Sequence, residues 1–232
     1  MTRVAATVAR PRAVLRRRPT RPVEALIAVS WLALVAGEAA GEGSVAGESW
    51  AALLPMWVAM TMAMMLPSAL PAVRHVADHS LRRRRRQAMA EFLAVYVAVW
   101  AMAGVILLAA LAALPGPGRA ALPVALLLAA AWQVAPAKRW ALRRCHRTAP
   151  LAPSGRRATA TVGRFAALNA TGCVASCWAL MAVTVLVPGV QAPWMAATAV
   201  AVAAEKLAER PRAVARAIAA LLGVAAVVAL LV

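Results

Sequence analysis

Residues 50–73 read WAALLPMWVAMTMAMMLPSALPAV and contain no charged side chain. An apolar stretch of about 20 residues is long enough for an α-helix to cross the hydrocarbon core of a bilayer. Hydrophobic residues make up 63% of the 232 positions, whereas ordinary soluble domains are about half apolar. The stretch therefore predicts a membrane-spanning helix in a chain that is apolar along most of its length.

Six further apolar segments predict spans of the same kind, at residues 23–40, 87–114, 120–136, 165–188, 190–204 and 213–232. Together they predict an all-α, polytopic bundle of about seven transmembrane helices. We expect residues 1–22 to form a disordered, basic cytoplasmic arm and residues 23–232 to form a single transmembrane domain. The arm and the first span could also act as a secretory signal, but the Gly-Glu-rich sequence that follows is not a clean cleavage site, which favours a retained helix.

The basic residues are distributed unevenly between the two sides of the predicted bundle. The chain has 26 Lys and Arg residues against 8 Asp and Glu residues. With seven spans, all of the 26 except Arg119 fall on one side, and the loop after residue 136 includes Lys138. The positive-inside rule assigns that side to the cytoplasm. We therefore predict a multi-pass protein of the inner (plasma) membrane, with its N-terminus in the cytoplasm and its C-terminus outside.

The same basic loops are expected to contact anionic lipid headgroups, and the run from Arg82 to Arg86 is interpreted as a solvated, lipid-facing anchor. The lipid surface explains the positive charge without a nucleic-acid partner. No nucleic acid is therefore predicted to bind.

Methionines in the second span are candidate metal ligands. Met60 and Met64 are four residues apart and share a helix face, with Met65 beside them. Thioethers are soft ligands that suit Cu(I), although methionine also fills gaps in apolar cores. Pro67 interrupts the backbone hydrogen bonds of this helix, and such breaks often line a site at membrane depth.

Cysteines in the fifth span and in the preceding loop are the second set of candidates. Cys173 and Cys177 are four apart, so two thiolates on one face could bind a soft or borderline metal. They could equally be inert buried cysteines, and a disulfide is disfavoured in the reducing cytoplasmic half of the span. Cys145 and His146 form a weaker pair, because flanking arginines repel a cation.

Two ionisable groups lie near predicted membrane edges. His75 could be a ligand or a proton relay, but a plain interfacial residue beside the arginine run is the favoured interpretation. Glu205 could be functional at the membrane edge, or it could belong to a surface charge cluster with Lys206, Glu209 and Arg210. The predicted topology brings Met64, Cys173 and Glu205 to the same inner half of the membrane.

Three blocks of residues carry a resemblance to a known family. The first comprises Trp57, Met60, Ala63, Met64, Met65 and Pro67; the second Pro136, Lys138, Leu142 and Cys145; the third Cys173, Cys177, Trp178, Leu180 and Met181, followed by the pairs Gly189-Val190, Trp194-Met195 and Glu205-Lys206. Over roughly residues 50–210 the chain resembles a bacterial family of predicted metal-binding integral membrane proteins of unknown function. The resemblance implies a helical membrane fold and metal binding through these blocks.

The chain departs from the family pattern at the cysteines. Ala141 and Ser176 stand where the family has cysteines, so two of five motif cysteines are missing. Ala175 replaces a glycine, and His146 replaces an arginine. The resemblance therefore leaves open whether this member binds metal through its remaining sulfur atoms and His146.

The leading functional hypothesis is a non-enzymatic protein that binds copper, or a similar metal such as zinc, for transport or delivery. Met60, Met64, Met65, Cys173 and Cys177 would be ligands, with Cys145 and His146 as a handover point to a metal-delivery or membrane protein partner. The alternative is a non-catalytic scaffold or assembly subunit whose motifs only pack helices. A membrane enzyme is disfavoured, because the spans offer no paired histidines for haem and no nucleophile–base constellation.

Overall fold

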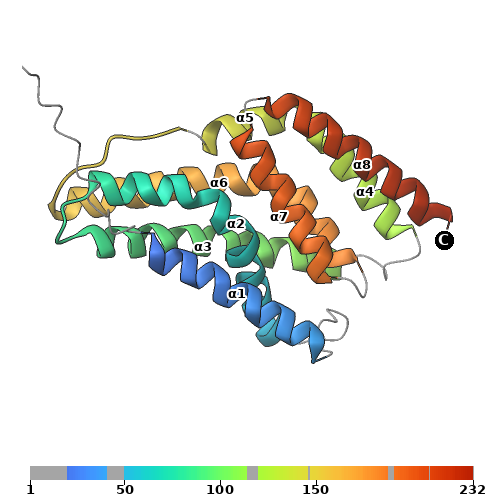
Figure 1. The fold of residues 1–232 in the computed structure, drawn as a ribbon, viewed down its shortest axis with the longest axis horizontal. Coiled ribbons are helices and arrows are strands. Elements are labelled where there is room, and N and C mark those ends of the chain that lie inside the picture. Colours follow the sequence, from blue (N-terminus) through green and yellow to red (C-terminus); the bar gives the residue numbers. More distant parts are fainter. Residues whose placement is uncertain are drawn as a thin grey trace, which may run out of the picture.

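The computed structural model describes residues 20–40, 50–113, 120–145, 147–187, 191–208 and 210–231, and within these ranges it contains helices and no strand. The helices are α1 (Arg21–Ala39), α2 (Trp50–His79), α3 (Arg85–Ala112), α4 (Ala121–Val134), α5 (Pro136–Cys145), α6 (Gly155–Leu186), α7 (Gln191–Leu207) and α8 (Pro211–Leu231). Figure 1 shows α3 and α6 running side by side, with α4 and α8 packed together at one end of the bundle. The predicted all-α class is confirmed.

Each of the seven predicted spans falls on a helix, but the helix boundaries differ. The second span continues to His79, the fifth begins at Gly155, and α5 is an additional helix in a predicted loop. Five of the helices are long and apolar enough to cross a membrane, or six if α4 and α5, which meet at an angle of 69°, count as one broken span. The prediction of seven spans and the orientation of the termini stay predictions.

Three prolines lie inside α2, at positions 55, 67 and 71. A proline inside a helix removes one backbone hydrogen bond and its ring pushes against the preceding turn, which bends the helix. Figure 1 shows α2 changing direction along its length. The hydroxyl of Ser68, beside Pro67, donates to the carbonyl of Met65 at 2.7 Å.

Aromatic residues of α3 form the centre of the apolar core. Phe92, Tyr96 and Trp100 follow one another at intervals of four, share a helix face and are buried. The next position on that face, Gly104, leaves the space that the Trp57 indole occupies. Trp57 Nε1 donates to the carbonyl of Trp100 at 2.8 Å, so this indole, predicted from the sequence as part of a functional motif, joins α2 to α3.

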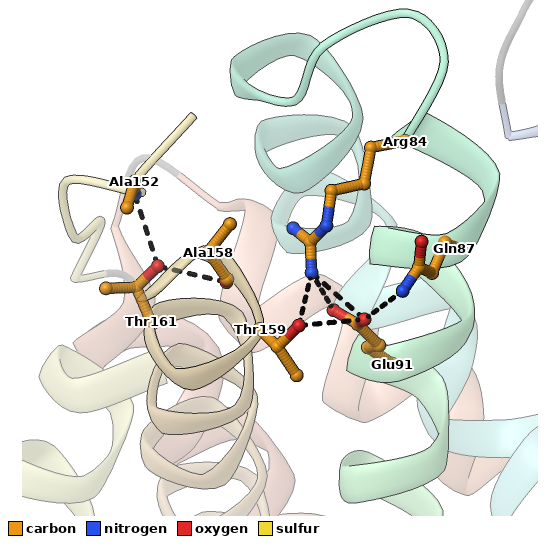
Figure 2. A network of polar contacts seen from close by, with 7 residues as sticks. All are labelled: Arg84, Gln87, Glu91, Ala152, Ala158, Thr159 and Thr161. Carbon is orange, nitrogen blue, oxygen red and sulfur yellow. Dashed lines mark hydrogen bonds and ion pairs between the residues drawn. The ribbon is translucent and has the colours of Figure 1, made fainter. Parts of the chain in front are cut away.

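A polar network joins the beginning of α3 to the beginning of α6, as Figure 2 shows. Arg84 Nη2 donates to both carboxylate oxygens of Glu91, at 2.7 and 2.9 Å, and to Thr159 Oγ1 at 2.7 Å. Arg85 Nε donates to the carbonyl of Ala77 at 2.8 Å. Arg84 and Arg85 thus hold helix ends together, and the lipid-facing anchor formed by Arg82 to Arg86 stays a prediction.

Candidate metal centre

The three cysteines come from two helices that pack closely. Cys173 and Cys177 lie one turn apart on α6, and each is 1% exposed. Cys145 is the last residue of α5, and a Cβ atom added at Gly172 would lie 3.1 Å from both its Sγ and its backbone nitrogen. Asn169 Nδ2 donates to the Cys145 carbonyl at 2.9 Å and satisfies an acceptor at the end of α5. The glycine thus allows the end of α5 to approach the cysteine face of α6.

The ammonium group of Lys206 lies against these sulfur atoms. Lys206 Nζ donates to Cys173 Sγ at 3.0 Å and to Ser68 Oγ at 2.9 Å. The side chain is buried, and within the described ranges no carboxylate pairs with it. Cys177 lies one turn further along α6, and Cys145 lies against Gly172, next to Cys173. A cation in the interior therefore has sulfur as its main partner.

A second lysine lies beside the first and is paired with an acid. Lys138 Nζ of α5 lies 2.7 Å from Glu205 Oε2 and donates to Oε1 at 2.9 Å, and both side chains are 1% exposed. Glu205 directly precedes Lys206, so the last turn of α7 supplies one group to the ion pair and one to the sulfur cluster. The prediction that Lys138 lies in a loop is wrong, and of the two alternatives for Glu205 the surface charge cluster is excluded, because Glu205 and Lys206 are both buried.

Neutral polar groups complete the surroundings of the thiols. The Tyr96 hydroxyl donates to Cys173 Sγ at 3.2 Å. Ser176 Oγ donates to the Cys173 carbonyl at 2.9 Å and lies 3.3 Å from Cys177 Sγ. Cys173 thus receives hydrogen bonds from both Lys206 and Tyr96, which stabilise negative charge on a sulfur atom.

The predicted methionine ligands lie on α2 in the same hydrophobic cluster as Cys173 and Cys177. Met60 and Met64 are buried, and Ser68 follows Met64 at the same interval of four. These three positions share one face of α2, and Ser68 directly contacts Lys206. Met65 is fully buried and contributes its carbonyl to Ser68.

The remaining predicted residues have mostly structural contacts. His75 Nε2 lies 3.0 Å from the carbonyl of Ala149, and its ring lies 5.3 Å from that of Phe165. Trp178 is partly exposed and meets Trp132 edge-on at 5.4 Å. His146 lies outside the described residues. The structure therefore brings together the cysteines and Glu205 and leaves His75 at a separate end of α2.

The residues that sequence reasoning missed are Lys138, Lys206, Ser68 and Tyr96. A signal for two of them was present, because Lys138 and the Glu205-Lys206 pair belong to the sequence blocks that carry the family resemblance. Ser68 and Tyr96 had no such signal. Their role depends on which helices are neighbours, and the spacing along the chain does not contain that information.

The chemistry of this centre suits a soft metal ion with few ligands. No group of three or more His, Cys, Asp and Glu side chains in the described ranges has the geometry to hold a metal ion. A tetrahedral zinc site, which requires four ligands, finds no support there. Cu(I) prefers thiolate and thioether sulfur and accepts two such ligands. The donor set therefore fits Cu(I), which would be cargo and not a resident cofactor.

Comparison with known proteins agrees with this chemistry. Residues 54–229 match the family model described as PpoB2, copper chaperone. The chain belongs to the PpoB2 copper chaperone family. The match covers α2 to α8 apart from the outermost residues, and so includes all three cysteines, both buried lysines and Glu205. The match confirms the part of the sequence prediction that assigned the chain to a metal-related family. No curated protein and no solved structure matches the chain.

Proposed function

We propose that this protein is a non-enzymatic, membrane-embedded copper chaperone that binds Cu(I) at the thiols around Lys206. Cys173 is the principal ligand, and Cys177 or Cys145 supplies the second sulfur. The observation that carries the proposal is the contact of 3.0 Å between Lys206 Nζ and Cys173 Sγ in the interior. Membership of the PpoB2 family indicates that the metal is copper, and the geometry of the thiols suggests how the protein holds it.

The charges of the described groups support this assignment. Lys138 and Lys206 contribute two positive charges to the buried cluster and Glu205 contributes one negative charge, which leaves one positive charge in excess. An unpaired buried charge is costly. Cu(I) bound by two thiolates carries one net negative charge, so the loaded site would be neutral. Binding would release the protons of the two thiols.

The methionines on one face of α2 provide further sulfur donors at increasing distance from the thiols. Ser68 contacts Lys206, and Met64 and Met60 follow on the same face at intervals of roughly 6 Å along the helix axis. Weak thioether ligands along this face would let Cu(I) move between the thiols and the other end of α2. The direction of movement would be set by a metal-delivery protein partner on the cytoplasmic side.

Apolar outer surfaces support a membrane location. Large apolar side chains point outward from α1 (Val29, Leu32), α3 (Met102, Ile106) and α8 (Leu221, Val224). Soluble proteins rarely expose contiguous apolar surface of this extent. Combined with the concentration of basic residues on one predicted side, these surfaces favour a multi-pass protein of the inner (plasma) membrane with a cytoplasmic N-terminus.

Competition with a chromophoric Cu(I) chelator tests the proposal on the purified full-length protein. One equivalent of Cu(I) should bind, and Cys173→Ser should lower the affinity by at least about 100-fold, because a hydroxyl is a poor ligand for a soft ion. Met102→Leu on the outer face of α3 is the matched control for loss of a sulfur atom. A folded Cys173→Ser protein with unchanged affinity would overturn the proposal and favour a scaffold role.

A further inference from the structure

A large basic cavity opens behind the ion pair of Lys138 and Glu205. It has a volume of about 870 Å³ and lies between α5, the end of α7 and the beginning of α8, with the end of α4 at its base. Figure 1 shows these segments meeting around α5, at the upper edge of the view. Pockets of this size are large enough for a small-molecule ligand or a headgroup.

Arginines from two helices face this cavity. Arg139 and Arg143 lie four residues apart on α5, and Arg212 and Arg216 lie four apart on α8. Residues at this spacing share a helix face, so each helix presents a pair of guanidinium groups to the same space. Within the described ranges none of the four pairs with a carboxylate.

Among the described residues that line the cavity, the one acid is already engaged. Glu205 is bound to Lys138, and Lys206 also lines the wall. The walls therefore carry a large excess of positive charge. Side chains of one sign around a concave, low-dielectric space concentrate the field and attract ions of the opposite sign.

A buried polar side chain also lines the cavity without a partner. Gln133 is 2% exposed, and neither its amide nitrogen nor its amide oxygen has a hydrogen-bond partner among the described residues. Leaving a buried amide unpaired costs free energy, and such groups usually have a protein, water or ligand partner. Gln133 thus points to a polar ligand in this cavity independently of the arginines.

We propose that this cavity is a binding site for a phosphate-bearing anion. Guanidinium groups bind phosphate through two parallel hydrogen bonds, and pairs on facing helices can engage different oxygens of one ligand. Gln133 and Lys138 would contact the part of the ligand that enters deepest. The ligand is either the headgroup of an anionic phospholipid or a soluble phosphate compound, since basic pockets between helices on the cytoplasmic side bind such headgroups.

Two measurements on the purified full-length protein distinguish the sources. Native mass spectrometry detects phosphatidylglycerol retained from the membrane. Isothermal titration with inorganic pyrophosphate, on protein in phosphatidylcholine nanodiscs, detects a soluble anion. Retained lipid without pyrophosphate binding identifies a headgroup site, pyrophosphate binding without retained lipid identifies a soluble ligand, and both together identify a site open to either. Binding in neither measurement overturns the proposal.

A double variant of the lining arginines and a matched control test whether the anion binds in this cavity. Arg143→Gln/Arg216→Gln should reduce whichever binding is observed by at least tenfold. Arg156→Gln/Arg157→Gln removes the same charge from exposed positions of α6 outside the cavity and should leave binding unchanged. Equal loss in both double variants would mean non-specific attraction to a basic surface and would overturn the proposal.

Gln133→Leu tests the deep end of the cavity even if the arginine variant fails to fold. Removing an unpaired buried amide should raise the melting temperature of ligand-free protein, because the unsatisfied polar atoms are gone. The same change should weaken anion binding several-fold. A variant that binds as tightly as the wild type would show that the ligand does not reach Gln133 and would contradict the site as proposed.

Discussion

Lys206 Nζ lies 3.0 Å from Cys173 Sγ, in an interior where the described ranges offer this ammonium no carboxylate partner. Cys173 is at the same time the acceptor for the Tyr96 hydroxyl at 3.2 Å. Two donors, one of them cationic, converge on one sulfur atom. This arrangement prepares Cys173 to carry negative charge, which is the form in which a cysteine binds metal.

The first prediction concerns the charge of Lys206. Lys206→Leu removes the cation that balances a thiolate and adds no sulfur ligand, so the Cu(I) affinity should fall at least about tenfold, the equivalent of ~1.4 kcal/mol. The measurement is competition with a Cu(I) chelator. Arg156→Gln, which removes an exposed cation from α6, is the control and should bind normally. Tighter binding by Lys206→Leu would show that the ammonium only repels the metal.

The second prediction concerns the buried ion pair. Glu205→Gln leaves the Lys138 ammonium buried without its counter-charge, and removal of one partner of such a pair typically costs about 3–5 kcal/mol of stability. The variant should therefore melt at a clearly lower temperature in detergent. Lys138→Met/Glu205→Gln removes both charges and should recover much of the loss, measured against Glu205→Gln and Lys138→Met alone. If the two single changes simply add in the double variant, the groups do not interact as the distance of 2.7 Å implies.

The third prediction concerns the close approach of α5 and α6. Gly172→Ala places a methyl group 3.1 Å from the Cys145 Sγ and backbone nitrogen, so α5 must shift at a cost of about 1–3 kcal/mol. We expect a lower melting temperature and faster alkylation of Cys145. Gly163→Ala is the matched control on the same helix, because no described atom lies within 4 Å of its added methyl group. It should be neutral or slightly stabilising, and a similar loss of stability in both variants would contradict the packing argument.

The fourth prediction concerns the methionine face of α2. Met64→Leu conserves volume and apolar character but removes the thioether nearest to the thiol cluster on that face. Affinity for the first Cu(I) should change little, whereas the rate of copper transfer to a Cu(I) acceptor should fall several-fold. Stopped-flow transfer to a chelator measures this rate, with Met102→Leu as the control. A normal transfer rate would mean that Met64 only packs the core, as buried methionines commonly do.

Much of the fold follows from residue patterns, since apolar runs and prolines are local properties. The spacing of Cys173 and Cys177 likewise identifies a shared helix face from the sequence alone. The pairing of Lys138 with Glu205 could not be predicted in that way, because the partners are 67 positions apart and meet only once α5, which turns away from α4, brings Lys138 to the end of α7. Charged residues near a predicted membrane edge are also expected to be exposed to solvent unless a buried partner is known. Both partners belong to the sequence blocks that carry the family resemblance, but those blocks do not indicate that the two side chains are in contact.

X-ray absorption spectroscopy of the Cu(I)-loaded protein reports the ligands of the metal directly. We predict one Cu(I) per chain with two or three sulfur ligands and no nitrogen or oxygen ligand, and loss of this signal in Cys173→Ser. A folded wild-type protein that binds no copper, or binds it through nitrogen and oxygen ligands, would contradict the proposal that the thiols around Lys206 hold the metal.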